Sequence, residues 1–259
     1  MEIYSPPVYF LSDCHLPLIV KPGQESRQNL VLKFLREEAS KARTLFLVGD
    51  IFDFWFEWRR SVPGAAFPVL AELHRLAQQG VKIIYLAGNH DGHPGRFLRD
   101  EVGSAISRVS VNAEIEGKKF HILHGDGIAL HDRAYRALRS LVRWKPTETI
   151  YRLIHPDIGI WFANKVSKYS HVTIDKGKFA DLKFYRDYAE KKLDEGFNYV
   201  VMGHIHKAGV FEHPNGGFYA IGDWIGAHSY GVFENGGMHL KYFKVDSRES
   251  EVEKSEVER

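Results

Sequence analysis

Short runs of apolar residues recur along this chain, and a glycine or a polar residue follows each of them. Residues 8–11, 45–48 and 81–86 are such runs, and less regular, charged stretches separate them. A short apolar run bounded by turn residues is typical of a buried strand.

Stretches with helical periodicity lie between and after these predicted strands. Residues 24–42, 65–79 and 180–196 place apolar side chains at helical spacing among charged ones. Strands that alternate with helices predict an α/β fold in which neighbouring strands are parallel. Further strands are expected, the last three forming a second sheet finished by hairpins, at residues 109–115, 118–123, 198–202, 218–221, 230–233 and 239–245.

Residues with metal-binding side chains follow the ends of five predicted strands. They are Asp13 with His15, Asp50, Asn89 with His90, His124, and His204 with His206. In α/β sheets, ligands bind at the carboxyl ends of the strands. Asp and Asn are also common in ordinary turns, so each residue alone favours a turn. Five coincidences in chain order favour the hypothesis that these residues converge on a pair of metal ions, with Asp50 bridging the two.

The types of residue narrow the chemistry. Seven side chains are predicted as ligands: Asp13, His15, Asp50, Asn89, His124, His204 and His206. Only two are carboxylates, and mixed imidazole and carboxylate ligation suits Mn, Fe, Co or Zn rather than Ca or Mg. Seven ligands exceed one catalytic ion but fit two, and such a pair can hold a hydroxide and stabilise phosphoryl displacement.

Four residues near the predicted ligands are assigned roles other than metal binding. Strand alternation would turn Asp13 and His15 to one side and Cys14 to the other, so Cys14 is expected to be a buried filler. His90 is predicted to be a general acid that Asp91 orients. The alternative for His90 is a turn histidine. Asp53 is expected to support a ligand through a hydrogen bond.

Composition limits the kind of protein. The 259 residues suit one large domain, expected at residues 1–245. The net charge of +2 gives no case for a nucleic-acid partner, and the single cysteine fits a reducing compartment. The beginning of the chain lacks the features of a signal peptide, so a cytoplasmic location is expected. Residues 246–259 carry six acids and three bases and are expected to form a disordered acidic tail.

Residues 128–180 interrupt the alternation of strands and helices. Helical patterns cover most of the segment, and residues 131–183 hold eleven Lys or Arg against five acids. A basic helical insertion with apolar faces could cap a site and contact an anionic lipid surface. A solvated helical hairpin is the alternative. The aromatic run at residues 52–58 has two interpretations as well, a loop packed on the core or an apolar wall beside the site.

The motifs Asp-x-His, Gly-Asp-x-x-Asp, Gly-Asn-His-Asp, His-Gly-Asp and Gly-His-x-His occur in this order between residues 13 and 206. They resemble those of the calcineurin-like metallophosphoesterase superfamily. The resemblance implies a β-sandwich of two mixed sheets flanked by helices. It implies one metal held by Asp13, His15, Asp50 and His206, and another held by Asp50, Asn89, His124 and His204.

A narrower resemblance is to the UDP-2,3-diacylglucosamine pyrophosphatases of lipid A synthesis. It rests on Gly-Asp-Ile-Phe-Asp-Phe-Trp from Gly49 and on Asp-Arg-Ala-Tyr from Asp132. It implies cleavage of UDP-2,3-diacylglucosamine to UMP and the lipid 1-phosphate, two ions that are expected to be Mn²⁺, and contact with the inner face of the cell membrane. The residues implied to contact substrate are Asp132, Tyr135, Asn164 and Lys168.

One position departs from the narrower family. Many of its members carry Arg after the metal-binding Asn, whereas this chain carries His90, as the wider superfamily does. Another dimetal phosphoesterase, acting on a cyclic nucleotide or a phospholipid diester, is therefore the alternative. A non-catalytic scaffold is a third interpretation, but the intact ligand set argues against it.

Overall fold

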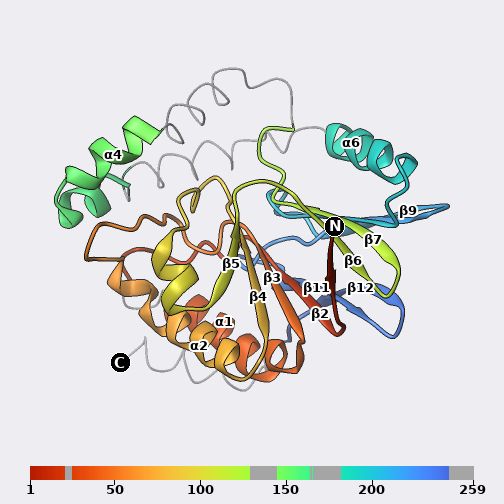
Figure 1. The fold of residues 1–259 in the computed structure, drawn as a ribbon, viewed down its shortest axis with the longest axis horizontal. Helices are drawn as coiled ribbons and strands as arrows, with labels where there is room; N and C mark the ends of the chain where they lie inside the picture. The colour runs from red at the N-terminus through yellow and green to blue at the C-terminus, as the bar shows by residue number, and fades with distance from the viewer. Residues whose placement is uncertain (21–24, 129–144, 164, 166–181, 245–259) are drawn as a thin grey trace, which may run out of the picture.

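Two six-stranded sheets form the centre of the structure, a computed structural model that describes residues 1–20, 25–128, 145–163, 165 and 182–244 (Figure 1). The first sheet has the order β12-β11-β2-β3-β4-β5. Its strands are β2 (Val8–Leu11), β3 (Thr44–Val48), β4 (Lys82–Leu86), β5 (Ser104–Ser107), β11 (Ser229–Glu234) and β12 (Gly237–Tyr242).

The second sheet has the order β1-β6-β7-β8-β10-β9. Its strands are β1 (Glu2–Tyr4), β6 (Val111–Ile115), β7 (Lys118–Leu123), β8 (Tyr199–Met202), β9 (Gly209–His213) and β10 (Gly216–Ala220). Both sheets mix parallel and antiparallel pairs. The expectation of an α/β fold with two mixed sheets is confirmed.

Helices cover the outer faces of the sheets. The described helices include α1 (Glu25–Glu37), α2 (Phe67–Gln78), α4 (Lys145–Leu153) and α6 (Leu182–Asp194), with short helical turns at Ala39–Lys41, Gly64–Ala66 and Phe97–Glu101. Figure 1 shows α1 and α2 along the first sheet and α6 over the second. Apolar side chains of α1 and α2 share a buried cluster with β2, β3 and β4, and those of α6 share one with β8 and β10.

Alternation along β3 shows why its sequence is continuously apolar. Leu45 and Leu47 belong to the cluster under α1 and α2, whereas Phe46 and Val48 belong to the cluster between the two sheets. All four side chains are fully buried. Burying each one contributes roughly 1.5–3 kcal/mol. Both faces of β3 therefore contribute to the hydrophobic core, and polar functional residues can lie only at the ends of the strand.

The C-terminal strands correct one expectation. The predicted strands near residues 230–233 and 239–245 are β11 and β12, but they extend the first sheet, because β11 pairs antiparallel with β2. The hairpin that extends the second sheet is β9 with β10. Three short strands were not predicted from the pattern: β1, β5 and β9. β1 is only three residues long, and β5 and β9 lie at sheet edges, where one partner strand and partial burial weaken the apolar signal.

The aromatic run after β3 packs on the core and anchors α4. Phe56 is buried, and its ring centroid lies 4.8 Å from that of Tyr151 on α4. The indole of Trp58 donates a hydrogen bond to the carbonyl oxygen of Ile154 at 3.0 Å. Residues 156–163 form a second helical segment, and the Tyr151 hydroxyl donates to the carbonyl of Gly159 in it at 2.7 Å. No helix in the described part of the chain is long and apolar enough to span a membrane.

Candidate metal centre

The predicted ligands follow the carboxyl ends of five strands that meet at one edge of the sandwich. β2, β3 and β4 are parallel neighbours in the first sheet, and β7 and β8 are parallel neighbours in the second. Parallel strands bring their carboxyl ends to the same edge of a sheet. Residues after each of these strands therefore meet between the two sheets.

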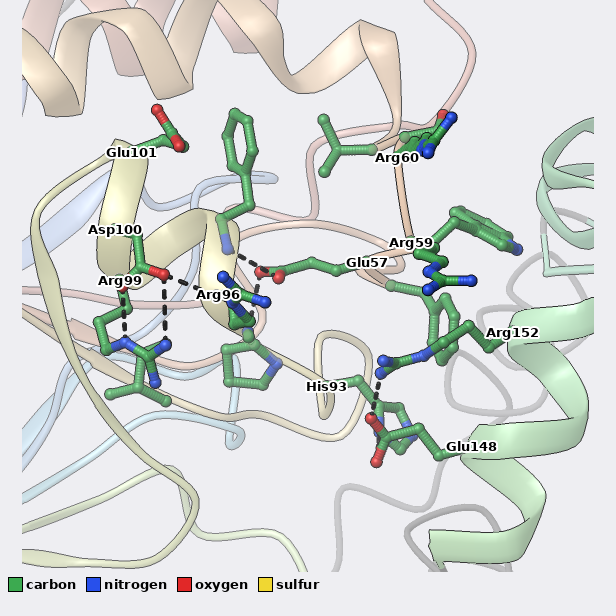
Figure 2. A pocket seen from close by; sticks show the side chains of 18 of the residues that line it. Glu57, Arg59, Arg60, His93, Arg96, Arg99, Asp100, Glu101, Glu148 and Arg152 are labelled. Atoms are coloured by element: carbon green, nitrogen blue, oxygen red, sulfur yellow. Dashed lines mark hydrogen bonds and ion pairs between the residues drawn. The ribbon is translucent and has the colours of Figure 1, made fainter.

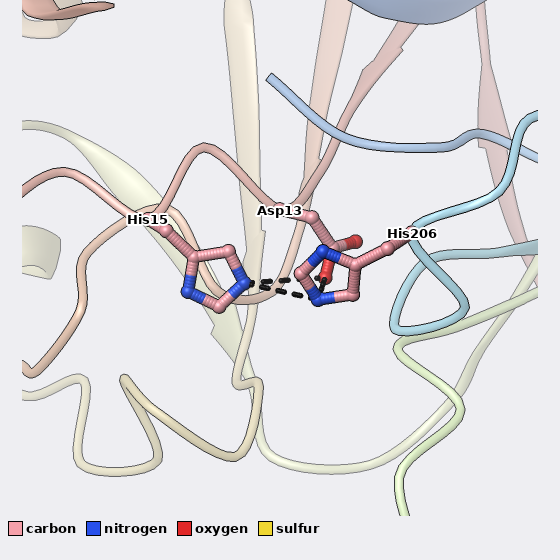
Figure 3. A group of neighbouring side chains, drawn as sticks. All are labelled: Asp13, His15 and His206. Atoms are coloured by element: carbon pink, nitrogen blue, oxygen red, sulfur yellow. Dashed lines mark hydrogen bonds and ion pairs between the residues drawn. The ribbon is translucent and has the colours of Figure 1, made fainter. Parts of the chain in front are cut away.

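One group of donors consists of Asp13, His15 and His206 (Figure 3). The Asp13 Oδ1 atom lies 3.7 Å from His15 Nε2 and 3.5 Å from His206 Nε2. The two Nε2 atoms lie 3.2 Å apart. Three potential ligand atoms thus surround one small volume.

A second group consists of Asp50, His124 and His204. The Asp50 Oδ2 atom lies 3.3 Å from His124 Nε2. The amide oxygen of Asn89, Oδ1, lies 3.0 Å from the same His124 nitrogen. All seven predicted ligands therefore lie in or beside the two groups.

Asp50 lies between the groups. Its Oδ2 atom is 3.9 Å from His15 Nε2 as well as 3.3 Å from His124 Nε2. Its other oxygen, Oδ1, accepts a hydrogen bond from the backbone N–H of His90 at 2.8 Å. One carboxylate oxygen is thus fixed by the backbone, and the other is shared by the two donor groups.

Acceptors behind the histidines orient the rings. The Nδ1 atom of His15 lies 3.2 Å from Asp53 Oδ1, and that of His206 lies 3.3 Å from Asp223 Oδ2. His124 Nδ1 donates to the carbonyl oxygen of Val48 at 2.9 Å. A proton on Nδ1 leaves the lone pair on Nε2, the arrangement of metal-binding histidines. The expected supporting role of Asp53 agrees with this geometry.

Asp223 was missed from the sequence. It follows β10 at the same edge, so the strand-end signal was present, but it has no histidine beside it to distinguish it from a turn residue. Its carboxylate also accepts the backbone N–H groups of Gly226 and Ala227. Despite its partial burial, the hydrogen bond from His206 and these amides lower the pKa of Asp223 to about 2.

The arrangement of donors fits cations. Among the described residues, no hydrogen-bond donor reaches the buried Asp13 Oδ1 atom. With Nδ1–H groups turned to Asp53 and Asp223, the Nε2 lone pairs of His15 and His206 would repel each other at 3.2 Å. A positive ion between them removes both problems. An unpaired buried carboxylate oxygen would otherwise carry the full cost of its desolvation.

Electrostatic effects of the carboxylates point the same way. Burial alone would lower the pKa of His15, but the neighbouring carboxylates of Asp13 and Asp53 outweigh it and raise the pKa to about 10. Burial opposes the charge of His124 in the same way, but the charge of Asp50 outweighs it and raises the pKa of His124 to about 10. The pKa of His204 is lowered to about 4 by burial and by its neighbour His124. The buried carboxylates of the centre thus stabilise positive charge at His15 and His124, as they would stabilise a bound cation.

Asp91 has a different role from the one predicted. It is fully buried, and its carboxylate accepts hydrogen bonds from the backbone N–H groups of Asp50, Ile51 and Gly88 and from the Tyr85 hydroxyl. It does not orient His90, because these donors surround its oxygens. The His90 Nδ1 atom instead lies 3.0 Å from the carbonyl oxygen of Asp53. Asp91 therefore holds the loop that carries Asp50.

The ligand loops have an unusual backbone. Five of the seven predicted ligands have a positive φ, between 45° and 65°: Asp13, His15, Asp50, His204 and His206. Cys14 is buried, as expected. Strand alternation does not explain this burial, because the chain after β2 is not extended. Gly88 allows the close approach of the next loop, since a Cβ there would collide with the carboxylate of Asp50.

The predicted substrate-binding residues Asp132, Tyr135, Asn164 and Lys168 lie outside the described residues, as does the predicted tail. The described part of the insertion exposes apolar side chains. Ile150 and Leu153 on α4 are mostly exposed, and so are Ile158, Trp161 and Phe162 on the following helical segment.

Two facing mixed sheets place two groups of His and Asp side chains at their shared edge, an arrangement suited to binding metal ions. The calcineurin-like phosphoesterase family model matches residues 6–208, and the chain belongs to this family. Among curated relatives, UDP-2,3-diacylglucosamine hydrolase of Porphyromonas gingivalis is 26% identical over 247 residues, covering 88% of this chain and 94% of the relative. The protein of the same name from Neisseria meningitidis serogroup B is 29% identical over 223 residues, covering 84% and 90%. A solved archaeal phosphodiesterase is 14% identical, covers 92% of this chain and all of its own, and superposes with a TM-score of 0.47.

Proposed function

We propose that the protein hydrolyses the pyrophosphate bond of UDP-2,3-diacylglucosamine, giving UMP and 2,3-diacylglucosamine 1-phosphate. The position of Asp50 supports the class of chemistry, because one carboxylate oxygen faces both donor groups. Two relatives that are named UDP-2,3-diacylglucosamine hydrolase support the substrate. Each matches most of this chain.

Two divalent ions would occupy the centre, with Mn²⁺ the expected metal. Asp50 would bridge them. Asp13, His15 and His206 would complete one site, and Asn89, His124 and His204 the other. Bound there, the ions would provide a nucleophile at neutral pH and neutralise charge on the phosphorus oxygens.

The residues of the chain would fix the ions and hold the substrate. Asp53 and Asp223 keep the Nε2 lone pairs of His15 and His206 directed inward. His90, whose ring centroid lies 4.8 Å from that of His15, would protonate the leaving oxygen or stabilise its charge. An oxygen from water would join the phosphorus as the bond from phosphorus to the bridging oxygen breaks, and His90 would act on that leaving oxygen.

The insertion would hold the acyl chains. The exposed apolar residues of the two helical segments, together with the basic charge of the insertion, suit a lipid with anionic phosphates. Burying acyl chains contributes about 0.8 kcal/mol per CH₂ group. Asp132, Tyr135, Asn164 and Lys168 would contact the sugar and phosphates. The same surface would place the protein at the cytoplasmic face of the membrane.

The proposal is tested with Mn²⁺-loaded protein and two substrates. UDP-2,3-diacylglucosamine should yield UMP, and bis-p-nitrophenyl phosphate should be cleaved by the same centre. Asp50→Asn should abolish both reactions and lower metal content, whereas the control Lys241→Gln, a surface residue paired with Glu234, should change neither.

A wild-type protein that cleaves the small diester and ignores the lipid would retain the phosphoesterase chemistry and reject the substrate. The alternative is a phosphodiesterase that acts on a cyclic nucleotide or a phospholipid diester. His90 favours this alternative, because many UDP-2,3-diacylglucosamine pyrophosphatases have arginine at this position. Active protein that holds one ion or none would reject the two-metal proposal itself.

A further inference from the structure

A second concave site, lined by arginines, lies beside the aromatic run and α4. The cavity has a volume of about 870 Å³. Figure 2 shows it from close by. Its guanidinium groups come from four separate parts of the chain, and they belong to Arg59, Arg60, Arg96, Arg99, Arg108 and Arg152.

The carboxylates around this arginine pocket do not balance its charge. Six guanidinium groups face four carboxylates, which leaves two positive charges. Asp100 is shared by Arg96 and Arg99, and Glu148 is shared by Arg108 and Arg152. Each of these carboxylates therefore serves two arginines.

A third carboxylate is occupied by the backbone. Glu57 accepts hydrogen bonds from the N–H groups of Gly95, Phe97 and Leu98. It caps the short helical turn at Phe97–Glu101 and has no ion pair with the pocket arginines. Its charge thus stabilises the fold of one wall.

Arg59 and Arg60 remain without an ion pair among the described residues, although both lie on the rim of the pocket. In Figure 2, Arg59 and Arg152 lie on one side of the opening, with Arg96 and Arg99 on the other. Gathering like charges costs free energy unless an anion binds between them. Guanidinium groups are also suited to two-point hydrogen bonding with phosphate oxygens.

We propose that the arginine pocket binds a phosphate group, and that it does so separately from the metal centre. None of the predicted metal ligands lines it. The wall that contains Glu148 and Arg152 belongs to α4, and the other walls belong to the core. A bound phosphate would therefore join α4 to the core loops through its oxygens. The phosphate would come either from a soluble organic phosphate or from an anionic lipid headgroup.

The test uses Mn²⁺-loaded full-length protein and phenylphosphonate, a phosphate mimic that cannot be hydrolysed at its carbon–phosphorus bond. Titration calorimetry should show binding that the double variant Arg59→Gln/Arg60→Gln weakens roughly tenfold or more, since each lost charge-assisted hydrogen bond is substantial. Neither substitution leaves a carboxylate without its partner. The matched control is Lys118→Gln/Lys119→Gln, an adjacent pair of exposed cations on β7 that also lack ion pairs within the described part of the chain.

Asp50→Asn separates this site from the metal centre, because pocket binding should persist when the metal centre is disabled. Vesicles of phosphatidylcholine with and without phosphatidylglycerol form the second arm and identify the source of the phosphate. Binding in either arm that depends on Arg59 and Arg60 supports the proposal. Binding that is absent in both arms, unaffected by the arginine variant or abolished by Asp50→Asn overturns it. The arginine variant should hydrolyse bis-p-nitrophenyl phosphate as fast as wild type. The outcome of the binding test therefore does not depend on whether UDP-2,3-diacylglucosamine is the substrate.

Discussion

Replacing Asp223 with asparagine tests how ring orientation controls the metal centre. The Asp223 Oδ2 atom lies 3.3 Å from His206 Nδ1, and the Nε2 atom of the same ring lies 3.5 Å from Asp13 Oδ1. The other oxygen of Asp223 accepts backbone N–H groups at Gly226 and Ala227. The carboxylate therefore holds both its own loop and the histidine.

Asparagine keeps one oxygen for the backbone amides but removes the negative charge that stabilises a proton on Nδ1. The loop should remain folded, whereas His206 should lose its preference for presenting Nε2 to a metal. Loss of such a supporting hydrogen bond typically weakens metal binding about 10–100-fold. This factor corresponds to about 1.4–2.8 kcal/mol.

The assay is the Mn²⁺ dependence of bis-p-nitrophenyl phosphate cleavage, with bound metal measured after dialysis. Asp194→Asn is the matched control, since Asp194 Oδ1 lies 3.3 Å from His213 Nε2 in a carboxylate–imidazole pair outside the centre. Asp223→Asn should require more Mn²⁺ than wild type, and Asp194→Asn should not. If both variants required as much Mn²⁺ as wild type, ring orientation by Asp223 would have no role in metal binding.

Two further predictions concern histidines inside and outside the centre. His90→Ala should slow turnover by about 10²–10⁴-fold while metal content stays constant, and a parallel loss of metal would reassign His90 as a ligand. Burial and the charge of Lys192 lower the pKa of His121 to about 4 in the folded protein, so the unfolded chain binds a proton first as pH falls. The advantage in unfolding free energy of wild type over His121→Gln, measured by urea denaturation of the Mn²⁺-loaded proteins, should therefore shrink from about pH 7 to about pH 4. A constant difference would contradict the lowered pKa.

Much of the fold and of the donor arrangement could be predicted because polar, potentially metal-binding residues follow directly after the apolar runs. β2, β3, β4, β7 and β8 all lie within two residues of their predicted bounds, since each contains a run of buried residues. The sequence did not indicate which of the two sheets each C-terminal strand joins. The pairing of β11 with β2 joins residues more than two hundred positions apart, and no local pattern in a Gly-rich stretch specifies it.

The role of Asp91 could not be read from its position. A carboxylate beside His90 in sequence suggests an orienting pair, but the sharp turn after β4 sends the Asp91 side chain into the interior. There Tyr85 and the backbone of the Asp50 loop surround it. Residues adjacent in sequence act together only when their side chains point the same way. The turn after β4 points the side chains of His90 and Asp91 in different directions.

Asp13 and His15 meet because both have a left-handed backbone conformation, and not because of the strand alternation expected from the sequence. Each left-handed non-glycine residue costs roughly 1–2 kcal/mol, although Asp and His tolerate it better than most. Five such residues would consume much of a typical net stability of about 5–15 kcal/mol. Hydrogen bonds between the loops offset part of this cost: Asp13 and His15 donate their N–H groups to the carbonyls of Gly49 and Asp50 at 3.1 and 3.0 Å. His204 donates its N–H to Asp13 Oδ2 at 2.8 Å. The loops thus fix one another, so a substitution that restores an ordinary backbone at one ligand should disturb the donors contributed by its neighbours.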